Sequence, residues 1–159
     1  MIGKHHKGAL LTLVDRKSLY VHIVHLGPTR ASSKTITCVL DRLRMSHAHS
    51  VTFDNGKEFS EHKRITDVGI DTYFTDPYKS IQRARNENTN GLIRQYMPKL
   101  SSFDDISNEQ IEQIEFALNH RPRKTLGCIR QVKLWLDFIL LHLLLESALL
   151  RMNEFNFYI

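Results

Sequence analysis

The pattern of apolar and polar stretches predicts an α/β protein. Two short apolar runs, at 9–14 and 19–26, are separated by a four-residue polar break, which is typical of an antiparallel hairpin. Apolar residues then recur at the i, i+3, i+4 and i+7 spacing of an amphipathic helix over 33–44. Ser32 or Ser33 is the expected N-cap of this helix.

The next stretch alternates strands and helices. The expected elements are a strand at 50–54, a helix at 58–68, a strand at 70–75 and a helix that begins near Asn86. A capping box at 107–110 then opens a helix with Ile111, Ile114 and Leu118 on its buried side. Antiparallel strands followed by alternating helices and strands indicate a layered α/β fold with a mixed sheet.

Two acidic residues have a notable position in this arrangement. Asp54 is the last residue of an expected strand, at the end where α/β sheets usually place chemistry. Glu87 lies on the expected helix after Asn86 and shares a helical face with Arg94. An isolated Glu is usually just a solvated side chain, but a second acid at a strand end favours a functional site. The residues of this helix that should pack inward are Leu92, Ile93 and Tyr96.

Four motifs resemble those of bacterial insertion-sequence transposases of the IS-thirty-like branch. They are Thr52–Phe59, Tyr73–Tyr78, Asn86–Tyr96 and Asn119–Gly127, in this order. The resemblance implies a DDE integrase-type catalytic core with a ribonuclease-H-like fold. Such a core cleaves DNA and transfers strands with two divalent ions, Mg²⁺ or Mn²⁺. Asp54 matches the second catalytic, metal-binding acid of the family, and Glu87 matches the third.

The charge of the chain favours a polyanionic partner. Twenty-two Lys and Arg against seventeen Asp and Glu give a net charge of +5. Together with the resemblance, this predicts DNA contacts, at transposon ends and target, through Lys57, Asn90, Arg94, Arg121, Arg123 and Lys124. A solvated basic turn is the alternative interpretation of 121–124. A homo-oligomer or a complex with an intact transposase is also expected.

The resemblance predicts a defect as well. In this fold the first strand carries the first acid and lies between the second and fourth strands. Counting back from the helix at 33–44 makes 19–26 the third strand and 9–14 the second, so the first acid would precede Met1. Asp15 is the only early alternative, but it lies in the hairpin turn. We therefore expect a truncated core that largely lacks its first strand, exposes unpaired backbone groups, folds poorly and is inactive.

The last part of the chain departs from the family. We divide the sequence into a catalytic core at 1–127 and a divergent Leu-rich helical tail at 128–159. Lys133, Asp137, His142 and Glu146 interrupt the tail's apolar run, so a membrane span is not expected. The spacing of Asp137, His142 and Glu146 indicates an amphipathic helix that lies on the core or on a partner. A frameshifted or rearranged end is an alternative origin.

The remaining features support two other classes of function. One is a non-catalytic DNA-binding remnant that inhibits or partners an intact transposase, and the other is a helical interaction module. No signal peptide is visible and Cys38 and Cys128 are interpreted as free thiols, so a bacterial cytoplasmic location near the nucleoid is expected. The pair His5-His6 lacks zinc-type spacing, and Asp76-Pro77 is interpreted as a turn.

Overall fold

The computed structural model describes residues 1, 8–27, 31–75, 80–98, 103, 106–147 and 156–158, without the side chains of 80–86, 145–147 and 156–158. The His5-His6 pair and the Asp76-Pro77 turn lie outside these residues. The elements are β1 (Ala9–Asp15), β2 (Val21–Gly27), α1 (Ser32–Met45), β3 (Ser50–Phe53), η2 (Lys57–Phe59), α2 (Lys63–Thr66), β4 (Asp71–Phe74), α3 (Ser80–Tyr96), α4 (Asn108–His120), β5 (Pro122–Arg123), η3 (Lys124–Leu126), β6 (Ile129–Arg130), α5 (Gln131–Ser147) and β7 (Asn156–Tyr158).

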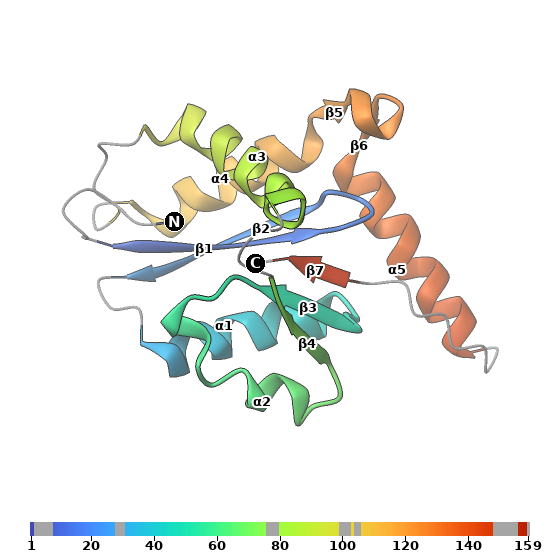
Figure 1. The fold of residues 1–159 in the computed structure, drawn as a ribbon. Helices are drawn as coiled ribbons and strands as arrows, with labels where there is room; N and C mark the ends of the chain where they lie inside the picture. Colours follow the sequence, from blue (N-terminus) through green and yellow to red (C-terminus); the bar gives the residue numbers. More distant parts are fainter. Residues whose placement is uncertain are drawn as a thin grey trace.

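A mixed five-stranded sheet in the order β2-β1-β7-β3-β4 forms the centre of the molecule. The strands β1 and β2 are antiparallel, and β3 and β4 are parallel. In Figure 1, α1 and α2 lie on one side of this sheet, and α3 and α4 lie on the other. The predicted α/β class and mixed sheet are thus confirmed.

The predicted hairpin is confirmed, but its second strand begins at Val21, two residues later than expected. The carboxylate of Asp15 shapes the turn, because its Oδ2 accepts hydrogen bonds from the backbone N–H of Ser18 (2.7 Å) and from the Ser18 hydroxyl (2.5 Å). Leu19 then adopts a left-handed φ of 57°, so the chain is extended only after the turn.

The position between β1 and β3 is occupied by β7, from the far end of the chain. This strand is antiparallel to β1, with Asp15 opposite Phe157, and parallel to β3, with Val51 opposite Phe157. The expectation of unpaired backbone groups is therefore wrong for Val14, Asp15 and Ser50–Thr52. Long-range strand pairing, which no local pattern reveals, supplies the partner.

Met1 occupies the same side of β1, nearer to the start of that strand. Its amino group donates to the carbonyl of Leu10 (2.6 Å), and the N–H of Leu10 donates to the carbonyl of Met1 (2.9 Å). Leu10 and Val14 are an even number of residues apart, so their backbone groups point to the same side of β1. Two segments, Met1 and β7, thus share one position in the sheet.

Two hydrophobic cores lie on the two faces of the sheet. One contains the buried side of α1, and the other contains residues of α3 and α4. The predicted periodicity of α1 is confirmed, but its expected serine N-cap is wrong, because the cap position is Ala31 and has no side-chain hydrogen bond. The Ser32 hydroxyl instead accepts from the backbone N–H of Glu61 (3.2 Å) and from the Ser60 hydroxyl (3.0 Å).

Two further helix predictions need correction. The helix α3 begins at Ser80 rather than near Asn86, and Tyr96 is 46% exposed, although Ile93 is buried and Leu92 packs against the core as expected. The expected helix at 58–68 is divided into the short helices η2 and α2. Packing against the core explains both differences. Phe59 of η2 and Ile65 of α2 are buried in the core, and directly after α3 the buried residue is Met97 and not Tyr96.

The helix α4 covers the outer edge of β2. The side chain of Asn119, which is 1% exposed, accepts from the N–H of Val21 (2.9 Å) and donates to its carbonyl (2.8 Å). Glu115 accepts from the N–H of Ile23 (2.7 Å). These side chains satisfy backbone groups of an edge strand, which would otherwise be open to pairing with another chain. The predicted capping box, Ser107 with Gln110, opens α4 and is confirmed.

The helix α5 is apolar on more than one side. Phe138 and Ile139 pack against the core that contains the buried side of α1, whereas Leu136 and Leu140 are 53% and 59% exposed. His142 is buried, so the expected polar face through this residue is wrong. The helix is therefore not amphipathic in the predicted sense. Within the residues that the structure describes, no helix is long and apolar enough to cross a membrane.

Candidate active site and nucleic-acid interface

Asp54 begins the loop that follows β3. Its Oδ1 accepts from the N–H of Gly56 (3.0 Å), and its side chain is exposed. The strand end is held by the buried ring of Phe53, which contacts Phe59 (4.7 Å between ring centroids) and Phe74 (5.8 Å). A buried strand end thus presents one carboxylate to solvent, at the position that the sequence predicts.

A second carboxylate, which the sequence analysis did not single out, lies beside Asp54. A Cβ placed on Gly56 would lie 2.7 Å from Oε2 of Glu58 and 2.9 Å from Oδ1 of Asp54. The two carboxylates therefore flank Gly56, and the absent side chain leaves room for both. The spacing Asp54-x-Gly56-x-Glu58 was the only sequence signal for this proximity.

Glu87 is exposed on α3. The position of this part of the helix is set by Thr89, which is buried, and by a hydrogen bond of 3.3 Å from the Thr12 hydroxyl on β1 to Oδ1 of Asn90. Asn90 therefore holds α3 against the sheet, in addition to the DNA contact expected of it.

Asp15 has a structural role in the hairpin. Its side chain is fully buried, and Oδ2 receives both hydrogen bonds from Ser18. A carboxylate held inside a turn is poorly placed to bind a metal ion at the surface. Asp15 therefore shapes the hairpin turn, and its exclusion from the catalytic residues stays a prediction.

The donor atoms near Asp54 suit a hard cation. Mg²⁺ usually takes one or two protein carboxylates and keeps several waters, and Asp54 and Glu58 offer such oxygens. Within the part of the chain that the structure describes, no three His, Cys, Asp or Glu side chains are grouped as a metal site. Asp54 and Glu58 thus fit a hard cation held by few protein ligands, and the two-metal arrangement expected from the resemblance stays a prediction.

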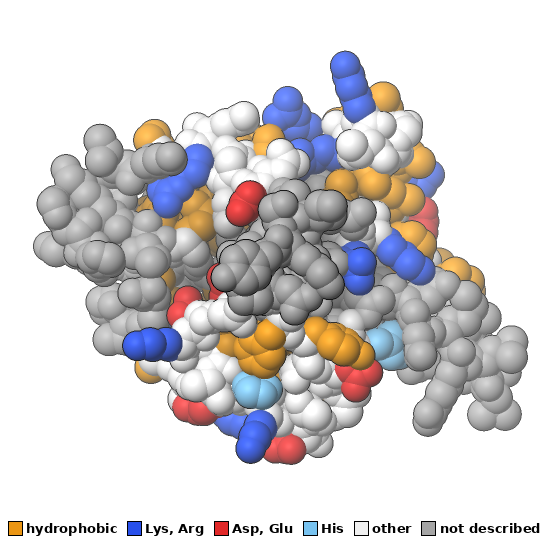
Figure 2. Space-filling view, in the orientation of Figure 1, with side chains coloured by type: hydrophobic (Ala, Val, Ile, Leu, Met, Phe, Trp, Pro, Cys, Tyr) orange, Lys and Arg blue, Asp and Glu red, His pale blue; other side chains and the backbone are white. Residues whose placement is uncertain are grey.

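The basic residues expected to contact DNA have different surroundings. Lys57, Arg121 and Lys124 are exposed. Arg94 donates to the carbonyl of Pro98 (3.4 Å) and lies 5.4 Å from the centroid of the Phe103 ring, so part of its guanidinium makes local contacts. On the face drawn in Figure 2, Lys and Arg side chains lie at several separate places.

Arg123 is half-buried and lines a pocket. Burial, and secondarily the charge of Arg121, lowers the pKa of Arg123. Arg16 and Lys17, from the β1–β2 turn, line the same pocket, and sequence reasoning missed them. Only their place in a turn, far from 121–124 in the sequence, could have drawn attention to them.

Searches for relatives gave several transposases, although no family model matches. The chain is 47% identical over 130 residues to the transposase of the insertion sequence IS4351 from Bacteroides fragilis, which covers 80% of this chain and 40% of that protein. It is 42% identical over 120 residues to the InsI transposase of IS30A from Escherichia coli. This match covers 74% of this chain and 31% of that protein. The chain thus spans less than half the length of these relatives.

Solved structures of retroviral integrases have the same fold. The HTLV-2 integrase catalytic core, solved with magnesium in a trimeric form, superposes with a TM-score of 0.58 at 17% identity, over 79% of this chain and 91% of that one. A simian T-cell lymphotropic virus intasome in complex with a PP2A regulatory subunit superposes with a TM-score of 0.53 at 20% identity. This match covers 71% of this chain and 47% of that chain. The predicted ribonuclease-H-like fold and the resemblance to this branch of transposases are confirmed.

Proposed function

Because most of this chain is homologous to bacterial insertion-sequence transposases and has the fold of retroviral integrase catalytic cores, we propose that it is part of a transposase core for metal-dependent DNA cleavage and strand transfer. The observation that carries the proposal is the exposed Asp54 at the carboxyl end of β3, in a sheet of this fold. The comparisons support DNA transposition as the process. The cleavage chemistry and the residue roles are our proposal.

Asp54 and Glu87 are the proposed catalytic metal ligands, and Glu58 could assist Asp54. A bound divalent ion, Mg²⁺ or Mn²⁺, would polarise the scissile phosphodiester and stabilise its developing charge. The carboxylates of this chain would hold and orient the ion, because carboxylate oxygens are the donors that Mg²⁺ prefers. Lys57, Asn90, Arg94, Arg121, Arg123 and Lys124 are the proposed DNA contacts.

Removing the carboxylate at the strand end should weaken metal binding. We expect Mn²⁺ affinity, measured by isothermal titration calorimetry, to fall by about tenfold or more in Asp54→Asn, because one charged ligand of the hard cation is lost. Glu87→Gln should also weaken binding. Asp67→Asn, which changes an exposed acid at the end of α2, is the matched control and should bind Mn²⁺ as the wild type does. Identical isotherms for the wild type and both site variants would remove the metal proposal.

DNA binding should be sequence-independent and strongly salt-dependent. Each phosphate contact contributes about 0.9 to the slope of log K against log salt, so the double variant Arg121→Ala/Lys124→Ala should lower the slope by roughly two. Lys63→Ala removes an exposed charge from α2 and should leave the slope unchanged. The measurement is fluorescence anisotropy of a labelled duplex between low and moderate salt. A flat salt response would contradict DNA binding through phosphates.

One observation favours the alternative of a non-catalytic DNA-binding remnant. The strand between β1 and β3 is Asn156-Phe157-Tyr158, which carries no carboxylate side chain. A first acid is therefore not provided from this position by the described residues. Nicking of supercoiled plasmid with Mg²⁺ or Mn²⁺ separates the two functions: the remnant binds DNA without turnover, whereas a catalytic core produces open circles that Asp54→Asn abolishes.

A further inference from the structure

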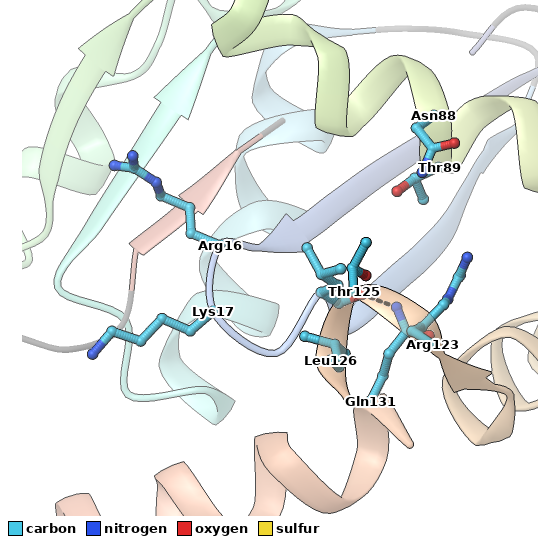
Figure 3. Close-up of a pocket in the computed structure, with 9 residues that line it drawn as sticks. Arg16, Lys17, Asn88, Thr89, Arg123, Thr125, Leu126 and Gln131 are labelled. Atoms are coloured by element: carbon cyan, nitrogen blue, oxygen red, sulfur yellow. Dashed lines mark hydrogen bonds between the residues drawn. The ribbon is translucent and has the colours of Figure 1, made fainter. Parts of the chain in front are cut away.

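A pocket of about 390 Å³ lies beside the helix that carries Glu87. Three segments form its walls: the β1–β2 turn, the middle of α3, and the chain from Arg123 to the start of α5. In Figure 3, Asn88 and Thr89 of α3 lie opposite Thr125 and Leu126, and Arg16 and Lys17 lie at one rim. We call this hollow the Arg123 pocket. Asn88 directly follows Glu87, so the pocket adjoins the proposed catalytic acid in the sequence of α3.

The charge of the Arg123 pocket suits an anion. Among the lining residues that the structure describes, three are cations, Arg16, Lys17 and Arg123, and none is acidic. The pKa of Arg123 is lowered by burial first and by the neighbouring charge of Arg121 second, and a bound anion would offset both effects. The lining is therefore basic, with Arg16 and Lys17 directed outward from the rim in Figure 3, and a phosphate is the anion that an arginine binds well.

Two residues that line the pocket, Arg123 and Gln131, carry polar atoms that no other protein group pairs. Nε of Arg123 and Oε1 of Gln131 are buried without a hydrogen-bond partner, whereas Nε2 of Gln131 donates to the carbonyl of Leu19. One donor and one acceptor of pocket-lining residues are thus unsatisfied, although both atoms lie beneath the pocket surface. Buried polar groups are normally paired, so we expect these two side chains to reorient toward a polar ligand.

The size and the apolar part of the wall favour a ligand larger than a bare phosphate. The volume lies in the range of small-molecule sites, about 300–1,000 Å³. Leu19 and Leu126 supply apolar surface next to the cations. A phosphate joined to a sugar and a base matches this mixture of charge, hydrogen bonds and apolar wall.

We propose that the Arg123 pocket binds one unpaired nucleotide of the DNA strand, with its phosphate at Arg123 and its sugar or base against Leu19 and Leu126. The inference rests on the proposed function, because DNA is the source of the nucleotide. A phosphate within a duplex stays on the helix surface, and a nucleotide enters a pocket only after leaving the stack. Arg16 and Lys17, at the rim, are placed to contact the flanking phosphates.

The test compares two DNA probes of equal duplex length, one blunt and one with a three-nucleotide single-stranded extension. Fluorescence anisotropy should show the wild type binding the extended probe about tenfold more tightly, the effect expected of one charge-assisted phosphate contact. Arg123→Gln should bind both probes equally. Arg130→Gln removes an exposed charge outside the pocket, so it should weaken both probes to the same extent and keep their ratio.

A second variant tests the effect of the cavity separately from the effect of the positive charge. Thr125→Trp retains every cation but fills the cavity from an exposed position, so it should lose the preference for the extension and keep the affinity for the blunt duplex. Thermal melting confirms that each variant is folded.

Three results would overturn the inference. They are equal binding of both probes by the wild type, an unchanged ratio in Arg123→Gln, and an unchanged ratio in Thr125→Trp. If the wild type binds neither probe, the proposed function fails. If it binds both equally with a steep salt dependence, only the pocket inference fails.

Discussion

Deleting residues 148–159, and β7 with them, should abolish cooperative unfolding of this chain. The strand supplies the partner for Val14 and Asp15 on one side and for Ser50–Thr52 on the other. Each buried backbone group left without a partner costs about 1–3 kcal/mol. Several such groups approach a typical stability of about 5–15 kcal/mol. Thermal unfolding followed by circular dichroism should change from a sharp transition to a shallow one.

A point variant tests the same strand without removing the tail. Phe157→Pro removes a backbone N–H and should lower the stability substantially, because proline is not tolerated inside a sheet. Phe157→Val retains the N–H and a high β-propensity, and it serves as the control. If the truncated chain melts with the wild-type midpoint and sharpness, then β7 is dispensable and the central position does not need a strand from the C-terminal segment.

Asn119→Leu should lower the free energy of unfolding by about 2–4 kcal/mol, because two buried backbone groups of Val21 lose their partners. The amide of Asn119 bonds both the N–H and the carbonyl of Val21, and it is 1% exposed. Leucine fills a similar space and keeps water out, so solvent cannot replace these hydrogen bonds. Urea unfolding measures the change through a lower midpoint.

Asn108→Leu provides the matched control for this prediction. Asn108 lies on the same helix, at its exposed first residue, and the substitution should change the stability by less than about 0.5 kcal/mol. Equal effects of the two variants would mean that the loss at Asn119 comes from helix propensity and not from the contact with β2. A new tendency of Asn119→Leu to self-associate would support the protective role of α4 at the sheet edge.

The local elements could be predicted because hydrophobic periodicity depends on neighbouring residues. The hairpin, α1, β3, β4 and α4 with its capping box all follow from spacings within a few residues. The placement of Asp54 at a strand end follows in the same way. The resemblance of four short motifs supplied the ribonuclease-H-like fold, which periodicity alone does not distinguish from other mixed α/β sheets.

The beginning and the end of the chain meet through long-range strand pairing that no local pattern predicts. The three residues of β7 carry no periodic signal, and their pairing with β1 and β3 joins segments far apart in the sequence. The proximity of Glu58 to Asp54 depends on the loop around Gly56, and the Arg123 pocket combines a turn, a helix and a loop. Most of the elements and the likeness to transposases could be predicted from the amino-acid sequence, because both depend on residues that are close together in the chain. Which strand completes the sheet, and which cations face one cavity, depends on packing between distant segments.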